Sequence, residues 1–164
     1  MTAGVNGQQV QTEALIKMTV LNQAMGDYLM KKLPSRVTLQ DFTPHELAGK
    51  SYDLKSDTMT VDKSNIASIK FTSVSRMQGY AITFKTPVNF TYAAAGEAPH
   101  VMQLTTVNVQ LGDITNGVNP VISTTDNLVQ AGYNYYVVWN DGSLGIHNPG
   151  FITDVLNSSI QALK

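Results

Sequence analysis

The sequence contains no cysteine among its 164 residues. That absence excludes disulfide bonds, thiol catalysis and the covalent attachment of haem through a Cys-x-x-Cys-His motif. A chain of this length buries about two thirds of its unfolded surface, so it needs no covalent staple in order to fold.

Charged residues are also scarce. They make up 14% of the chain, against about a quarter in an average globular domain. The net charge is −1, and the Lys and Arg residues are scattered rather than gathered in a stripe, so we predict no nucleic-acid partner. Thr, Asn, Ser and Gln supply the polarity instead, a composition that suits antiparallel sheet surfaces, secreted domains and subunits of assemblies.

Long apolar runs are missing as well. No run approaches the roughly 18 apolar residues that a membrane-spanning helix needs, so we expect no membrane span in this chain. The first seven residues lack the basic start and apolar run of a signal peptide.

The N-terminal region predicts a helix. Residues 1–11 are rich in Gly, Asn and Gln, and we expect them to be flexible, with a single domain over 12–164. Thr12 is a candidate N-cap, and Pro34 stops the helix. Apolar residues recur between them at spacings of three and four, which predicts a helix of about twenty residues with one apolar face. These residues are Ala14, Met18, Leu21, Met25 and Tyr28.

The middle of the chain predicts strands. Residues 66–72 and 80–92 alternate apolar and polar side chains with a period of two, and 100–111 follows as a third strand. Pro87 cannot donate to a strand ladder, so the second strand is an edge there, or it bends and restarts. The predicted fold class is therefore α+β, with the long N-terminal amphipathic helix packed on an antiparallel β-meander and a C-terminal helix at the end of the chain.

Two shorter segments lie outside this meander. Residues 58–61 form a possible short strand. The run Thr43-Pro44-His45-Glu46 is typical of a capping box with Pro at the first helical position, which predicts one short helical turn. Glu46 is thereby explained as a cap, and a single His-Glu pair without a second histidine at helical spacing does not predict a metal site.

The segment 126–139 has two interpretations. Its Tyr, Val and Trp content favours a strand. Alternatively, Thr125 or Asp126 caps a helix that carries Leu128 and Val138 on its apolar face. Propensity alone prefers the strand.

The block from Asp141 to Phe151 is the densest group of backbone-specifying residues. Asp141-Gly142 predicts a tight turn, and Gly145 permits a positive φ. Asn148 is a candidate N-cap with Pro149 at the first helical position. Apolar residues then recur at helical spacing, which predicts a C-terminal helix over about 149–163.

The same region resembles a known family. Its motif residues are Ala131-Gly132-Tyr133-Asn134-Tyr135, then Asp141-Gly142-Ser143-x-Gly145-x-His147-Asn148-Pro149-x-Phe151, and Leu156. The segment 127–160 is similar to the haem-free C-terminal tail of multihaem c-type cytochromes from bacterial respiratory chains, with Phe151 where that family usually has Tyr. The resemblance implies a helix over 126–139, a periplasmic or cell-surface location in a bacterium and membership of a cytochrome complex.

The missing cysteines limit what this resemblance implies about cofactors. Because the chain cannot hold haem covalently, we expect no cofactor of its own. His147 is a candidate cofactor-binding residue only if the haem is non-covalent or is carried by a partner protein. A histidine satisfied by backbone groups near a helix start is the alternative, and we prefer it.

A group of aromatic residues is the other candidate site. Tyr133, Tyr135, Tyr136 and Trp139 lie close together in sequence, and with Asn148 they are the predicted interaction residues. Aromatic side chains at such spacing also serve simply as core. No catalytic residue and no metal ligand set is identified, so the sequence favours a non-enzymatic protein.

Three functions fit these observations. The first is a non-enzymatic extracytoplasmic subunit of a bacterial respiratory or cytochrome-associated assembly, acting through contacts with a protein partner or with further copies of itself. The second is a pilin-like structural subunit of a surface filament, since an amphipathic helix followed by a meander is the layout of such proteins. The third is a small-ligand sensor or binding domain.

Overall fold

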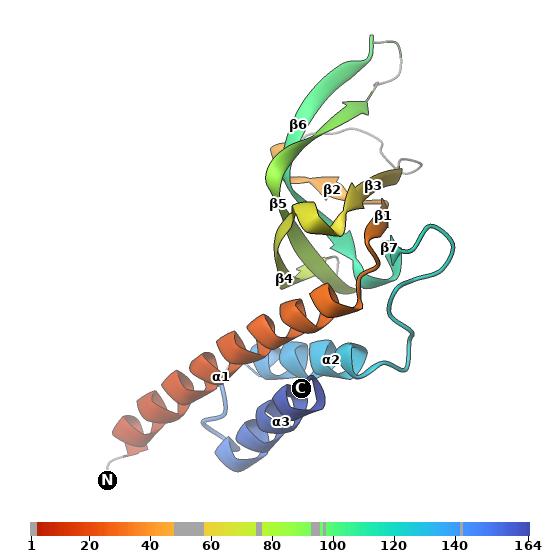
Figure 1. The fold of residues 1–164 in the computed structure, drawn as a ribbon. Coiled ribbons are helices and arrows are strands. Elements are labelled where there is room, and N and C mark those ends of the chain that lie inside the picture. The colour runs from red at the N-terminus through yellow and green to blue at the C-terminus, as the bar shows by residue number, and fades with distance from the viewer. Residues whose placement is uncertain (1–2, 48–57, 75–76, 93–95, 97, 142) are drawn as a thin grey trace. The chain divides into compact units, whose positions relative to one another are not determined.

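The computed structural model describes residues 3–47, 58–74, 77–92, 96, 98–141 and 143–164. The fold is α+β, with a long N-terminal helix, antiparallel sheets and C-terminal helices, as predicted (Figure 1). The chain divides into two compact units. We call Met1–Tyr28 with Thr124–Lys164 the helical unit, and Leu29–Ser123 the sheet unit.

The first helix, α1 (Ala3–Lys32), begins earlier than predicted. Thr12 is not its cap: the Thr12 hydroxyl donates to the carbonyl of Gln8 at 2.9 Å, one turn back inside the helix. The apolar stripe is confirmed in its central part, where the burial follows the three- and four-residue spacing. Its buried members are Ala14, Met18, Leu21 and Met25.

The second helix, α2 (Asn127–Asn140), corrects the strand interpretation of this segment. The carboxylate of Asp126 accepts a hydrogen bond from the N–H of Leu128 at 2.9 Å, which satisfies one of the free donors at the helix start. Leu128, Ala131 and Val138 are buried on one side of the helix. Capping and one-sided burial outweigh the β propensity of the Tyr and Val residues.

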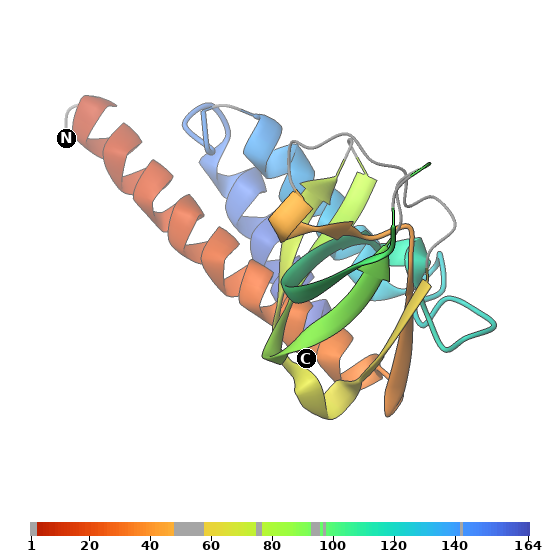
Figure 2. The same ribbon diagram turned by 90° about the horizontal axis from the view of Figure 1, so that it is seen from above.

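The third helix, α3 (Pro149–Ala162), begins and ends as predicted. It lies beside α2 in both ribbon views (Figures 1 and 2). The amide of Asn134 on α2 donates to the hydroxyl of Ser159 on α3 at 2.9 Å. The ammonium of Lys17 on α1 donates to Asn157 at 2.8 Å, so all three helices are connected by side-chain bonds.

The described residues of the sheet unit form two antiparallel sheets. One has the order β3–β1–β7 and the other β2–β6–β5–β4, and the second contains the predicted β4–β5–β6 meander. Among the described residues, 3-10 turns follow β2, β3 and β6; they are η1 (His45–Leu47), η2 (Lys63–Asn65) and η3 (Leu111–Asp113). The strands are β1 (Arg36–Gln40), β2 (Thr43–Pro44), β3 (Thr58–Asp62), β4 (Ile66–Val74), β5 (Met77–Tyr92), β6 (His100–Gln110) and β7 (Ile114–Thr115).

The disturbance of the ladder predicted at Pro87 is confirmed. The pairing of β5 with β6 shifts register between Thr83 and Val88, next to the proline that cannot donate. The side chain of Asn65 substitutes for a strand partner there: its oxygen accepts from the N–H of Thr86 at 2.9 Å, and its nitrogen donates to the Thr86 carbonyl at 3.0 Å. One amide thus satisfies both backbone groups of a residue in the irregular part of the ladder.

The same shift moves the buried face of β6. In a regular strand Val101 and Val107 would share one face, but Val101 is 69% exposed, whereas Val107 and Leu104 are fully buried. Val107 and Val109 are buried beyond the shift. A register irregularity moves side chains to the opposite face, so the period-two pattern does not hold across it.

The capping box predicted at Thr43 is wrong, whereas the short helical turn predicted after it is present as η1. Thr43 and Pro44 form β2 and pair with β6, and a 3-10 turn follows. The Glu46 carboxylate accepts hydrogen bonds from the backbone N–H of Thr105 at 2.7 Å and from its hydroxyl at 2.6 Å. Burial raises the pKa of Glu46, but the Thr105 bonds outweigh it and leave that pKa below the usual value. Glu46 therefore ties η1 to β6, where the ladder is irregular.

Candidate interaction groove

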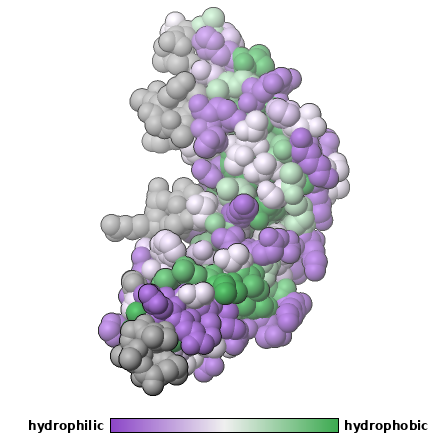
Figure 3. Space-filling view, turned by 90° about the vertical axis from the view of Figure 1, so that its left-hand side faces the viewer, coloured by the Kyte–Doolittle hydropathy of each residue, from purple (hydrophilic) through white to green (hydrophobic). Residues whose placement is uncertain are grey.

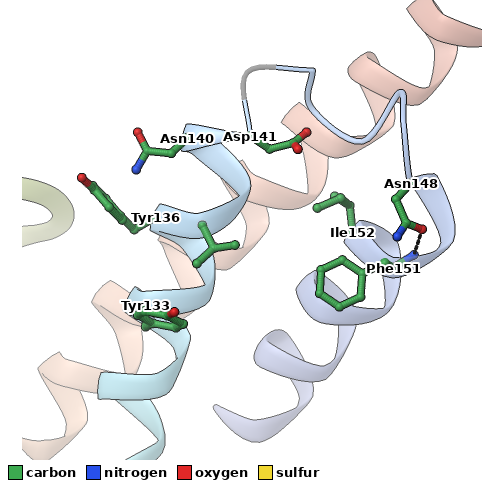
Figure 4. A pocket seen from close by; sticks show the side chains of 8 residues that line it. Tyr133, Tyr136, Asn140, Asp141, Asn148, Phe151 and Ile152 are labelled. Atoms are coloured by element: carbon green, nitrogen blue, oxygen red, sulfur yellow. Dashed lines mark hydrogen bonds between the residues drawn. The ribbon is translucent and has the colours of Figure 1, made fainter.

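A groove of about 600 Å³ runs between α2 and α3 within the helical unit (Figure 4). We call it the aromatic groove. Its walls are mainly apolar, and its polar groups are two side-chain amides, one carboxylate and two tyrosine hydroxyls. Its lining residues are Tyr133, Tyr136, Val137, Asn140, Asp141, Asn148, Phe151 and Ile152.

The α2 wall of the groove is one helix face. Tyr133, Tyr136, Val137 and Asn140 follow the spacing i, i+3, i+4 and i+7, which places them on one side of a helix. Tyr133 is 61% exposed, although it lies in a helix whose other side is buried. The helix therefore has two apolar faces, and the described residues bury only one of them.

The α3 wall is formed by its first turn. Phe151 is 53% exposed, whereas its neighbour Ile152 is buried. The side-chain oxygen of Asn148 accepts a hydrogen bond from the backbone N–H of Phe151, as the dashed line in Figure 4 shows. This cap fixes where the helix starts and so which residues of the first turn face α2.

The loop between the two helices is held by Asp141. Its carboxylate accepts hydrogen bonds from the Ser143 hydroxyl and from the Gly145 N–H, the latter at 3.2 Å. These bonds, with a smaller electrostatic contribution from His147, hold the pKa of Asp141 below its usual value. The carboxylate therefore stays ionised, and keeps both bonds, at pH values where an ordinary aspartate begins to protonate.

Gly145 is required by the close packing of this loop. Its φ is +91°, in the region that favours glycine, as predicted. A Cβ at this position would lie 3.3 Å from the Cβ of Ile152. The loop backbone can approach α3 this closely only because residue 145 has no side chain.

His147 lies in this loop and is exposed. The interaction that the structure gives it is its electrostatic attraction to Asp141. Among the described residues, no group of three or more His, Asp or Glu side chains is arranged to hold a metal ion. A role for His147 in binding a partner's haem stays a prediction.

The structure brings together part of the predicted interaction set. Tyr133, Tyr136 and Asn148 line the groove. Tyr135 is half-buried and Trp139 is 58% exposed, and neither lines it. Helical spacing separates them: residues 135 and 139 point away from the face that 133 and 136 share.

Five lining residues were not predicted as site residues: Val137, Asn140, Asp141, Phe151 and Ile152. The i, i+3, i+4, i+7 spacing would have identified the first two if 126–139 had been taken as a helix. Phe151 had no such signal, since its spacing matched the apolar face of the C-terminal helix.

The helices of the described segments include none that is long and apolar enough to cross a membrane. No family model, curated protein or solved structure matches this chain.

Proposed function

We propose that this chain is a non-enzymatic binding subunit that docks a protein partner in the aromatic groove between α2 and α3. The observation that carries the proposal is the exposed pair Tyr133 and Phe151 on facing walls of one groove. Aromatic side chains in well-packed pockets supply most of the binding energy of protein interfaces.

The composition of the surface supports this proposal. Figure 3 shows apolar side chains exposed in patches between hydrophilic ones on the face that it presents. Single exposed apolar residues are ordinary, whereas a group on one concave surface is typical of an interaction site. The polar residues Asn140, Asp141 and Asn148 supply a hydrogen-bonding rim.

The partner that we propose is a haem-bearing protein of an extracytoplasmic bacterial assembly. The support is the similarity of 127–160 to the tail of multihaem cytochromes, together with the order of elements there: a helix, a loop held by Asp141, and a second helix capped by Asn148. In this proposal the partner carries the haem, because the chain has no cysteine with which to attach one.

The test is a visible absorption spectrum of the tagged protein, purified gently from its native host. We expect a Soret band to follow the tag through size-exclusion chromatography. A Tyr133→Ala/Phe151→Ala double variant should lose it, because truncating aromatic anchors at an interface costs about 2 kcal/mol or more each. Val118→Ala, which truncates a highly exposed residue of the sheet unit, is the matched control and should retain it.

Two results would contradict the proposal in different ways. If no Soret band appears but a partner still binds through Tyr133 and Phe151, the proposed cytochrome association is wrong and the docking role remains. If the double variant binds the partner as well as the wild type does, the aromatic groove is not the docking site.

A filament subunit is the second candidate, favoured by one observation. Ile16 and Val20 are exposed on α1, opposite its buried stripe, so this long N-terminal helix has a second apolar face. Helices with two apolar faces pack on two sides. The packing of α3 beside α1, joined by Lys17 and Asn157, counts against a filament whose core is α1. Concentration-dependent polymers that Ile16→Ser/Val20→Ser abolishes would establish the filament reading, and a monomer at all concentrations would end it.

A further inference from the structure

A second groove, of about 710 Å³, lies entirely within the sheet unit. We call it the basic groove. It is formed where α1 ends, β1 begins and η2 leads into β4. Its lining residues are Met30, Ser35, Arg36, Asp62, Lys63, Ser64, Ile66 and Lys85.

Lys63 fixes the backbone on both sides of this groove. Its N–H donates to the carbonyl of Ser35 at 2.9 Å, and its ammonium donates to the carbonyl of Leu33 at 3.2 Å. These two bonds hold η2 against the segment that joins α1 to β1. The groove is therefore built by the fold before any ligand arrives, which lowers the entropic cost of binding.

The charges of the groove are unbalanced. Arg36, Lys63 and Lys85 face a single carboxylate, that of Asp62. The Arg36 Nε lies 3.6 Å from an oxygen of Asp62, and both side chains are largely exposed, so water and salt screen this pair. A guanidinium has five N–H donors, so the pairing through Nε leaves donors of Arg36 available to an anion.

The charge of the groove agrees with that of its unit. The sheet unit has nine Lys and Arg against seven Asp and Glu, a net charge of +2. The helical unit has two against five, a net charge of −3. An anion is therefore drawn to the sheet unit, and within it to the groove that holds three of the chain's eleven cations.

The walls of the groove are not only charged. Half-buried Met30 and the edge of buried Ile66 supply apolar surface, and the hydroxyls of Ser35 and Ser64 supply donors beside the cations. Small-molecule sites usually occupy about 300–1,000 Å³ and combine apolar walls with a few polar groups. We propose that the basic groove binds an anionic amphiphile: a carboxylate or phosphate head held by Arg36, Lys63 and Lys85, with its apolar chain against Met30 and Ile66.

The test is a titration with octyl phosphate, followed by amide chemical shifts in two-dimensional NMR of the full chain. We expect saturable shifts at residues 35–36, 63–66 and 85. The dissociation constant of octyl phosphate should rise with added salt, because charged side chains hold the head. Inorganic phosphate should bind at least about tenfold more weakly, since it lacks the CH₂ groups whose burial contributes about 0.8 kcal/mol each. Equal affinities for octyl phosphate and inorganic phosphate would overturn the proposal that the ligand is amphiphilic.

Charge-removing variants locate the site. Lys85→Gln should weaken octyl phosphate binding about tenfold, since it removes one charge-assisted hydrogen bond. Lys70→Gln, which removes an exposed charge of β4 outside the groove, is the matched control and should bind as the wild type does. Equal weakening by both variants, or by neither, would overturn the site.

Binding to vesicles distinguishes a membrane lipid from a free amphiphile as the source of the ligand. Phosphatidylcholine vesicles with and without a fifth of phosphatidylglycerol are tested by co-sedimentation. Binding to the anionic vesicles that Lys85→Gln abolishes supports the proposal with a membrane lipid as its ligand. Binding of octyl phosphate without binding to either vesicle supports it with a free amphiphile. Neither result depends on the aromatic groove, so the two proposals stand or fall separately.

Discussion

The side-chain oxygen of Asn148 accepts a hydrogen bond from the backbone N–H of Phe151 at 3.4 Å, so the residue that caps α3 also fixes the backbone that carries an exposed aromatic ring. One polar contact thus connects the start of a helix to one wall of the aromatic groove. The stability of α3 and the shape of this wall are therefore coupled at this position.

Removing the cap should be measurable. We expect Asn148→Ala to lower the free energy of unfolding by about 1 kcal/mol, because the first turn of α3 loses a partner for one of its free N–H groups. The measurement is urea denaturation followed by circular dichroism. Ser158→Ala, at an exposed position further along α3, is the control and should leave stability unchanged or slightly higher. Equal losses of unfolding free energy in the two variants would show that the Asn148 cap contributes no more than an ordinary surface side chain.

Replacing either of two glycines by alanine should change the stability of the fold, in opposite directions at the two positions. We expect Gly145→Ala to destabilise the fold by about 1–3 kcal/mol, because a φ of +91° strains any residue with a Cβ. The new Cβ would also crowd Ile152. Gly150→Ala, in the first turn of α3 with nothing within 4 Å of its added Cβ, should stabilise by about 0.4–1 kcal/mol. Thermal unfolding of the two variants checks both signs, and a stable Gly145→Ala protein would contradict the loop conformation.

The bond pair between Asn65 and Thr86 should stabilise the bend of β5. We expect Asn65→Ala to cost about 1–2 kcal/mol, because two hydrogen bonds are lost while water can reach the freed backbone groups. Faster amide exchange at Thr86, measured by NMR, would report the local effect. Asn89→Ala, an exposed asparagine of the same strand, is the control and should change neither quantity. Unchanged exchange at Thr86 in Asn65→Ala would contradict the role of the amide.

Asp113 should destabilise the fold when it is ionised. Burial, and then repulsion by Asp41, raise the pKa of its carboxyl above the usual value. A carboxyl whose pKa is raised by folding favours the folded state while it is protonated, and this advantage is lost as pH rises through the raised value. We therefore expect Asp113→Asn to be more stable than the wild type at pH 7.

The same reasoning predicts that this gain disappears at pH 3, where the Asp113 carboxyl is largely protonated in the folded and in the unfolded chain. Urea denaturation at the two pH values measures it. Asp154→Asn, on the exposed side of α3, is the control and should show no comparable difference between the two pH values. A gain of equal size at both values would point to a cause other than ionisation.

Local sequence signals predicted the elements whose causes are local. The Asn148-Pro149 cap, the glycine at 145 and the β4–β5–β6 meander lie where residue type and spacing put them. Each depends on interactions between residues a few positions apart, or on the pleat of a single strand, so a sequence contains the information directly.

The segment 126–139 shows that local propensity alone is not sufficient to predict secondary structure. The Tyr and Val content favours a strand, yet the segment is a helix capped by Asp126. A possible cap at Asp126 left the helix open as an alternative, whereas propensity favoured the strand. Intrinsic preferences differ by less than about 1 kcal/mol per residue, so a cap and a buried face reverse them.

The sequence by itself determined the α+β class, the capped last helix and the absence of any cysteine with which to hold haem. Only the tertiary structure decided that Tyr133 and Phe151 face one groove while Trp139 does not, and that Glu46 binds Thr105 instead of capping a helix. The physical reason is the same in each case. Caps and periodic burial are set by neighbours in the chain, whereas a groove or a carboxylate's partner depends on segments that meet only after folding.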